Sequence, residues 1–337
     1  MTCKRNDKMP NVSFEELVGE IAKLKSKRVM ISFHSLGDTD AIASAVGMSI
    51  VLHGSVIAAP DKATSNALRI MSKLGFDTSI IKESFVDDAE AVILVDVNNF
   101  ENCGTFREKL SDFKGPVMVI DHHKKIEDKD NMRIFDEESY NSASSIVYDL
   151  LHSFNISINV QLAKLLSMGI ISDSAEFKNA MPDTFIQLGE LFNTAKTTYM
   201  DLLEEVEHIS PASERIKTIN DILASKSVVH GNLLFMYGNA HAYANLAADD
   251  AIKMGADVVI FKSISNNEVS LSSRLRPTLD KKYGIHLGSI MKELSSIIKG
   301  TGGGHPCAAG AYGPESSSSD EFIEKFISKI LDKVGKA

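Results

Sequence analysis

The sequence predicts an α/β protein with two domains: an N-terminal doubly wound parallel-sheet domain and a smaller C-terminal α/β domain. The length of 337 residues exceeds the roughly 150 residues of one ordinary domain. In the first half, short continuous apolar runs alternate with helical patterns, which is typical of a parallel sheet covered on both faces. A second series of strand and helix patterns begins after residue 224.

Four buried strands are predicted in the first half, spanning residues 28–33, 55–59, 91–95 and 116–120. Helical patterns follow the first two strands, at residues 40–52 and 67–74, and Gly75 ends the second helix. Right-handed crossovers between parallel strands then make this a doubly wound sheet. The pattern from Ser142 to about Val206 is mostly helical. We place the first domain at residues 1–205 and a linker helix region at residues 206–224.

The second domain, residues 225–337, shows a mixed α/β pattern. Strands are predicted at residues 233–237, 257–262 and 269–273, and helices at 242–254 and 286–298. Asn266 and Asn267 predict a tight hairpin turn, because asparagine tolerates a positive φ. A last helix is predicted to begin near Ser318, which forms a capping-box pattern with Glu321.

The composition is that of a globular protein, with 44% hydrophobic and 24% charged residues. It excludes a disordered chain, a collagen-like repeat and a disulfide scaffold. The net charge of −9 argues against coating long nucleic acid, although a short anionic ligand remains possible where cations gather. Three scattered cysteines predict free thiols in a reducing cytosol. No apolar run is long enough to span a bilayer and the N-terminus carries no signal core, so we expect a cytoplasmic protein.

Acidic and imidazole side chains follow three of the predicted parallel strands. Because strands of a doubly wound sheet present their carboxyl ends at one edge, these groups should converge. So many carboxylates cannot all stay ionised without cations. Carboxylates and imidazoles without a thiolate suit manganese or magnesium better than structural zinc. The first strand leads into His34, Asp38 and Asp40, the third into Asp96, and the fourth into Asp121, His122 and His123.

The number of carboxylates indicates two divalent ions. Asp38, Asp40, Asp96 and one more carboxylate carry a charge of about −4, which two such ions cancel. Asp173, which follows an apolar helix, is the best candidate for the fourth. Two metals about 3.5–4 Å apart can share a bridging hydroxide and promote displacement at phosphorus.

These residues resemble the motifs of the DHH phosphoesterase family, in the RecJ-like superfamily, and of its branch with a DHH-associated C-terminal domain. The first motif is His34-x3-Asp38-x-Asp40-x3-Ser44, and Asp121-His122-His123 is the motif that names the family. Asp96 and Asp173 match the second and fourth motifs, and residues 301–310 match the glycine-rich signature of the associated domain. Two departures, Leu36-Gly37 before Asp38 and Ser172-Asp173-Ser174-Ala175 at the fourth motif, remove no ligand atom.

The resemblance implies two Mn²⁺ ions per chain, with Mg²⁺ or Co²⁺ as possible substitutes. It assigns His34, Asp38 and Asp96 to one ion, and to the other the residues Asp40, Asp96, His122 and Asp173. Asp96 would bridge the two ions. His123 would face the phosphate as a hydrogen-bond donor or an acid for the leaving group. Asp121 would fix an imidazole tautomer.

In the second domain, the resemblance implies a substrate-binding role for the glycine-rich signature. Backbone N–H groups of Gly302, Gly303 and Gly304 could approach an anion closely. His305 would contact a terminal phosphate or a base. Arg274 matches the position of a phosphate-binding arginine, whose guanidinium can bind phosphate through two hydrogen bonds. A catalytic cleft between the domains is expected, too narrow for a long duplex.

The function implied is a manganese-dependent phosphodiesterase of the nano-RNase kind, which releases mononucleotides from short oligonucleotides such as linear dinucleotides. The resemblance implies, as a second activity, removal of the 3′-phosphate from 3′-phosphoadenosine 5′-phosphate. Alternatives within the family are cyclic-dinucleotide phosphodiesterases, exopolyphosphatases, pyrophosphatases and RecJ-like single-strand exonucleases. A non-enzymatic nucleotide sensor is a further alternative, but the six expected ligand residues are all present. A homodimer is a family-level expectation.

Overall fold

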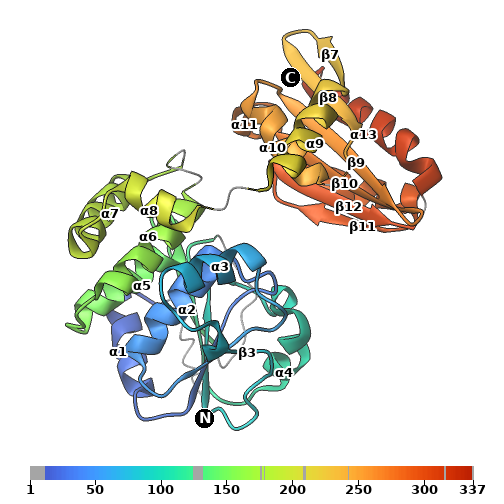
Figure 1. Cartoon of the computed structure of the whole chain (residues 1–337). Helices are drawn as coiled ribbons and strands as arrows, with labels where there is room; N and C mark the ends of the chain where they lie inside the picture. The colour runs from blue at the N-terminus through green and yellow to red at the C-terminus, as the bar shows by residue number, and fades with distance from the viewer. Residues whose placement is uncertain are drawn as a thin grey trace. The chain divides into compact units, whose positions relative to one another are not determined.

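The computed structural model describes residues 12–123, 132–174, 177, 179–207, 210–241, 243–314 and 316–335. The chain forms two compact units that divide between residues 207 and 208. Each unit contains its own β-sheet with helices packed on it (Figure 1). No helix within the described ranges is both long and apolar enough to cross a membrane. Cys103 and Cys307 are free thiols, as predicted, while Cys3 lies outside the described residues.

The first unit is built on the predicted parallel sheet. Its six strands pair in the order β3-β2-β1-β4-β5-β6, and all their pairings are parallel. The chain order reverses between β1 and β4, so the ligand crevice of such a sheet is expected beyond the carboxyl ends of these two strands. The strands are β1 (Val29–Ser32), β2 (Val56–Ala58), β3 (Ile81–Lys82), β4 (Ala91–Val95), β5 (Val117–Asp121) and β6 (Met132–Asp136).

Helices cover both faces of this sheet, which explains why its strands are apolar throughout. Ile93 and Val95 of β4 join a core formed with α2, α5 and α6, whereas Val92 and Leu94 pack with Phe100 on the opposite face. The helices are α1 (Phe14–Leu24), α2 (Thr39–Val51), α3 (Ser65–Lys73), α4 (Arg107–Asp112), α5 (Ala143–Ser153), α6 (Val160–Asp173), α7 (Pro182–Ala195) and α8 (Tyr199–Val206).

Two helix starts have side-chain caps that bear on the site described below. The Asp38 carboxylate caps α2 by accepting a hydrogen bond from the Ala41 N–H at 3.1 Å. The Ser142 hydroxyl caps α5 by accepting one from the Ser145 N–H at 3.1 Å. Such caps satisfy N–H groups that have no partner within the helix.

The second unit is built on a mixed sheet with the order β11-β12-β10-β9-β8-β7, in which β8 and β9 pair in parallel and the other neighbours are antiparallel. Helices α9 (Ala212–Leu223) and α10 (Ala244–Lys253) cover one face, and α12 (Leu287–Leu294) and α13 (Ser319–Val334) cover the other (Figure 1). Helix α11 (Pro277–Tyr283) follows β10. The strands are β7 (Lys226–His230), β8 (Leu233–Asn239), β9 (Val258–Ser265), β10 (Glu268–Leu275), β11 (Thr301–Gly304) and β12 (Ala308–Gly313).

The hairpin turn between β9 and β10 is confirmed, because Asn266 and Asn267 both have positive φ, 51° and 66°. The capping box at Ser318 is wrong. Ser318 ends a short 3₁₀ turn, so its backbone (ψ 6°) lacks the extended conformation of a capping residue, and its side chain makes no cap hydrogen bond. The helix predicted to reach residue 298 ends earlier as α12 and continues as a 3₁₀ turn over Ser295–Ile298.

Candidate metal centre

Asp96 lies at the centre of the site, directly after β4 at the reversal point of the first sheet. Its carboxylate is 3% exposed, and its backbone adopts a left-handed conformation with φ 53°. Among residues other than glycine, aspartate and asparagine tolerate this conformation best. Backbone strain of this kind is concentrated at functional sites, where surrounding contacts maintain it. Here the Asp96 N–H donates to the Ile120 carbonyl at 3.0 Å, which ties the turn to β5.

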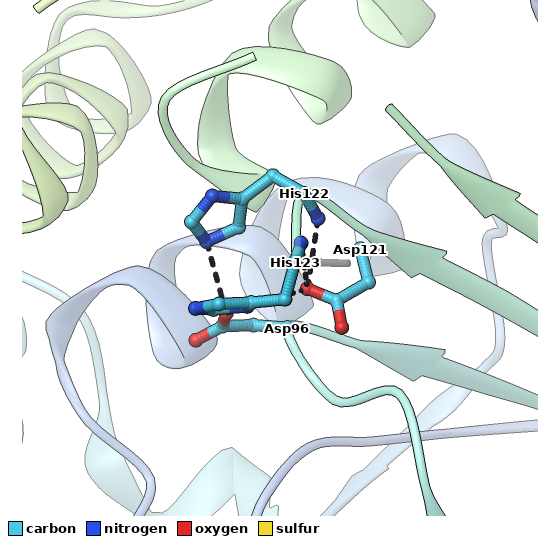
Figure 2. A group of neighbouring side chains, drawn as sticks. All are labelled: Asp96, Asp121, His122 and His123. Atoms are coloured by element: carbon cyan, nitrogen blue, oxygen red, sulfur yellow. Dashed lines mark hydrogen bonds and ion pairs between the residues drawn. The ribbon is translucent and has the colours of Figure 1, made fainter. Parts of the chain in front are cut away.

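Two imidazoles flank the Asp96 carboxylate, one at each oxygen. Oδ2 lies 3.4 Å from His34 Nε2. Oδ1 lies 3.5 Å from His122 Nε2 (Figure 2). His34 Nε2 is also 3.6 Å from Asp38 Oδ2, and His122 Nε2 is 2.9 Å from Asp173 Oδ2. Asp96 is therefore shared by three groups of candidate ligands, and within each group the ligand atoms lie within 4.8 Å of one another. Two of the groups match the ligand sets expected from the sequence, His34, Asp38 and Asp96, and Asp40, Asp96, His122 and Asp173. The third group is Asp96, Asp121, His122 and His123.

Asp40 is completely buried in the first turn of α2. Its Oδ2 accepts a hydrogen bond from the Ala143 N–H at 2.7 Å, and its Oδ1 accepts one from the Ser144 N–H at 2.9 Å. Both donors belong to the first turn of α5, where the helix dipole favours a negative charge. No pattern in the sequence predicts this contact between Asp40 and α5.

Asp121 holds the second histidine of the Asp-His-His segment. Its Oδ1 accepts hydrogen bonds from the backbone N–H groups of His122 and His123, at 2.8 and 3.2 Å, and lies 2.9 Å from His123 Nδ1 (Figure 2). Asp121 is fully buried, whereas the His123 side chain is 53% exposed. The contact with Asp121 raises the pKa of His123 above its ordinary value. The ring is thus fixed through Nδ1, with Nε2 as its other polar atom.

The pKa values in this cluster show how strongly the carboxylates act on one another. Burial, together with the charges of Asp173 and Asp96, holds the pKa of Asp40 well above its usual range. Burial also raises the pKa of Asp173. For Asp96, burial is outweighed by His122 and His34, which lower its pKa to about 2. In the same way, carboxylates outweigh burial and raise the pKa of His34 to about 10 and of His122 to about 11.

The donor set fits divalent cations. Asp96 Oδ1 and His122 Nε2 are buried, and their contacts with each other and with Asp173 Oδ2 lack the geometry of a hydrogen bond. Carboxylate and imidazole donors without a thiolate suit manganese and similar ions. A bound cation would replace the protons that the raised pKa values of His34 and His122 retain in its absence. The residues that would hold it come from the ends of β1, β4 and β5, the start of α2 and the last residue of α6.

The structure places the remaining predicted residues in the second unit. Arg274 lies in β10, opposite Ala308 of β12. The His305 N–H donates to the Ala308 carbonyl at 2.8 Å, so the turn after β11 adjoins the strand position of Arg274. The Arg274 guanidinium is paired with Asp249 of α10, with Nε 2.5 Å from Oδ1 and Nη2 3.2 Å from Oδ2. The sequence predicts a phosphate-binding arginine at position 274 but does not predict this carboxylate partner. No sequence signal distinguishes Asp249 from the neighbouring Asp250.

The three glycines of the signature have different surroundings. A Cβ on Gly302 would overlap the Met291 carbonyl of α12, and one on Gly304, whose φ is 131°, would lie 2.7 Å from the Ala308 carbonyl. A Cβ on Gly303 would meet no atom within 4 Å. Close packing therefore requires glycine at two of the positions, whereas Gly303 faces open space.

Two protein families match this chain. The DHH family, N-terminal domain, matches residues 28–170, and the DHHA1 domain matches residues 232–333. The sequence is 25% identical over 319 residues to the bifunctional oligoribonuclease and PAP phosphatase NrnA of Mycoplasma genitalium. That alignment covers 90% of this chain and 94% of the relative.

Solved structures share the fold. An exopolyphosphatase-related protein from Bacteroides fragilis superimposes with a TM-score of 0.76 at 16% identity, covering 95% of this chain and 96% of that chain. RecJ in complex with Mn²⁺ from Thermus thermophilus superimposes with a TM-score of 0.51 at 14% identity, covering 95% of this chain and 55% of that chain. With both of its domains matched and the acidic and imidazole cluster in place, this chain belongs to the DHH family of metal-dependent phosphoesterases.

Proposed function

We propose that this protein is a manganese-dependent phosphodiesterase that hydrolyses very short oligonucleotides, such as linear dinucleotides, to mononucleotides. The observation that carries the proposal is that Asp96 joins two different donor sets, His34 with Asp38 and Asp40 with His122 and Asp173. Such an arrangement suits two metal ions acting on one phosphate. The likeness to an oligoribonuclease along nearly the whole chain supports a short nucleotide as the substrate.

In this proposal, His34, Asp38 and Asp96 hold one Mn²⁺ ion, and Asp40, Asp96, His122 and Asp173 hold a second. When bound, the two ions would neutralise the phosphate and activate water for attack on it. His123 would donate a hydrogen bond to the phosphate or a proton to the leaving group. Asp121 would keep the His123 ring in the orientation that leaves Nε2 for this task.

The second unit would bind the part of the nucleotide that does not react. Arg274 would contact a phosphate, and the backbone N–H groups of Gly302, Gly303 and Gly304 would accommodate an anion. His305 would contact a terminal phosphate or a base. The acidic net charge of −9 favours a short ligand over a long duplex, whose binding depends on many cationic contacts.

A panel of substrates with product analysis tests the proposal. Manganese-loaded protein is incubated with linear and cyclic di-adenylate, RNA and DNA of graded length, pyrophosphate and polyphosphate. We expect AMP from linear di-adenylate, with rates that fall as the oligonucleotide lengthens. The Asp96→Asn variant, purified in the same way, controls for contaminating nucleases. Turnover of pyrophosphate or polyphosphate without turnover of the linear dinucleotide would contradict the proposal.

We propose a second substrate for the same site, 3′-phosphoadenosine 5′-phosphate, which would lose its 3′-phosphate. The name of the Mycoplasma genitalium relative combines the two activities, and both reactions break a phosphate ester at a ribose 3′-oxygen. Competition tests this: the bisphosphate should inhibit dinucleotide hydrolysis with a constant equal to its own KM. Additive rates with both substrates present would exclude a shared site.

A further inference from the structure

The carboxylate of Asp40 is held on both of its oxygens by the start of α5. Oδ2 accepts from the Ala143 N–H at 2.7 Å, and Oδ1 accepts from the Ser144 N–H at 2.9 Å. The Ser44 hydroxyl lies 3.5 Å from Oδ1. Backbone amides in a helix cannot rotate away as side chains do, so Asp40 is oriented before any ion binds. Oδ2 accepts one hydrogen bond and keeps a second lone pair for a cation.

Gly169 of α6 provides the space for this contact. It lies four residues before Asp173 on the same helix. A Cβ at position 169 would overlap the Ser144 Oγ atom and would lie 3.0 Å from both Asp40 Oδ1 and the Ala43 Cβ. Its backbone is helical and needs no glycine; inside a helix, glycine is less favourable than alanine by about 1 kcal/mol. The absent side chain is therefore explained by the approach of α6 to Asp40 and α5.

The Ser144 side chain fills the space between these helices. Its Oγ atom lies 3.3 Å from the Ser44 Oγ atom and 3.5 Å from the Asp40 carbonyl oxygen, and the residue is fully buried. A methyl group at position 169 would press on this hydroxyl. Because interiors are close-packed, the movement would be passed to the Ser144 N–H and so to Asp40 Oδ1.

We propose that Gly169 is a positioning residue: the space that it leaves lets the backbone N–H of Ser144 hold the Asp40 carboxylate in place beside Asp96, His122 and Asp173. The role rests on the proposed function, in which these four carboxylate and imidazole groups bind a cation. It predicts a selective effect. A larger side chain at position 169 should lower the affinity of the cation site that contains Asp40. It should leave the affinity of the site formed by His34, Asp38 and Asp96 unchanged.

Manganese binding to the full-length Gly169→Ala variant tests this role. Protein stripped with a chelator is titrated with Mn²⁺ by calorimetry, and bound manganese is counted by electron paramagnetic resonance. We expect two ions for the wild type. For Gly169→Ala we expect one ion of unchanged affinity and a second weakened at least about tenfold, the equivalent of about 1.4 kcal/mol. The melting temperature of the metal-free variant should fall by a few degrees at most, because the cost of overpacking is partly offset by the greater helix propensity of alanine relative to glycine.

A matched control and a rescue separate positioning from a general packing defect. Gly189→Ala places a methyl on another helix, α7, where no atom lies within 4 Å, and it should bind two ions normally. The double variant Gly169→Ala/Ser144→Ala removes the Oγ atom that the new methyl would overlap and should regain most of the lost affinity.

Three results would overturn the positioning role: two unaltered sites in Gly169→Ala, equal loss of both ions, or no recovery in the double variant. If Gly169→Ala alone fails to fold, the double variant still decides, because it is expected to fold and to bind two ions. A wild-type protein that binds no manganese would instead overturn the proposed function, and the positioning role with it.

Discussion

The guanidinium of Arg274 and the carboxylate of Asp249 form a two-point ion pair in the second unit, with N–O distances of 2.5 and 3.2 Å. The carboxylate takes the edge formed by Nε and Nη2, and Nη1 donates to the Ser273 carbonyl at 3.0 Å. The outer edge, between Nη1 and Nη2, is therefore the one that the pair presents to a further anion. Asp249 orients the arginine that we propose as a phosphate ligand.

Arg274→Ala should weaken nucleotide binding about tenfold or more, because hydrogen bonds to charged groups contribute about 1.5–3 kcal/mol. Hydrolysis of a small nitrophenyl phosphodiester should be unaffected, since that substrate has no second phosphate. The measurements are KM for linear di-adenylate and kcat for both substrates. Asp249→Asn keeps the positive charge and should cost less than Arg274→Ala. Equal losses with both substrates would show that Arg274 does not bind the nucleotide.

Asp96→Asn should abolish turnover and leave the fold intact. Asparagine tolerates the left-handed backbone at this position, so far-UV circular dichroism should not change, while the charge shared by both donor groups is lost. Excess Mn²⁺ should raise the melting temperature of the wild type, because a ligand at 100 times its Kd stabilises the folded state by about 2.7 kcal/mol. It should not do so in the variant. Near-normal activity, or an equal shift in both proteins, would contradict the metal assignment.

Gly303→Ala separates anion binding from packing in the glycine-rich strand. With open space around the added methyl, the melting temperature should stay close to that of the wild type, while affinity for the nucleotide falls because an anion can no longer approach the backbone closely. Gly302→Ala serves as the contrast: its methyl would overlap the Met291 carbonyl, and the melting temperature should drop by several degrees. Normal nucleotide affinity in Gly303→Ala would exclude this strand as an anion site.

Manganese binding should release protons at pH 8. In the metal-free protein, nearby carboxylates raise the pKa of His34 to about 10 and of His122 to about 11 despite burial, so both rings carry a proton that an ion must displace. Calorimetric titrations in Tris and in HEPES, which differ in ionisation enthalpy, measure the number of protons released. Affinity for Mn²⁺ should fall as the pH is lowered. Identical enthalpies in the two buffers would show that neither histidine is a ligand.

The same pKa values fix the direction of the stability change in the metal-free protein. A histidine whose pKa is raised on folding stabilises the fold below its ordinary pKa of 6.5, and this contribution is lost as the pH rises through about 10. Metal-free protein should therefore melt at a lower temperature at pH 9 than at pH 6.5.

The first sheet could be predicted because its strands are buried on both faces and read as continuous apolar runs. The strand at residues 91–95 was predicted with its observed bounds. Strands β3 and β6 were missed, since β3 has two residues and β6 carries Arg133 within its apolar run. Glycine has low strand propensity, and no strand was expected over Thr301–Gly304.

The positions of the candidate ligands along the chain followed from their places after strands. The contacts that hold these ligands in place could not be predicted in this way. These contacts join segments that are distant in sequence. They are the hydrogen bonds that α5 donates to Asp40, the close approach of α6 at Gly169, and the ion pair of Arg274 with Asp249. Each depends on how helices pack against one another, which local propensity and hydrophobic periodicity do not specify.

The left-handed backbone at Asp96 makes this position unusually intolerant of replacement. Asparagine satisfies the backbone but brings no charge, and glutamate brings the charge but adds a longer side chain to a conformation that it disfavours. Asp38 is less restricted, because its backbone is extended and its side chain is 44% exposed. Among related proteins that hydrolyse phosphate esters, we therefore expect substitutions at the position of Asp38 before the position of Asp96. A related protein without an aspartate at the position of Asp96 is expected to be inactive.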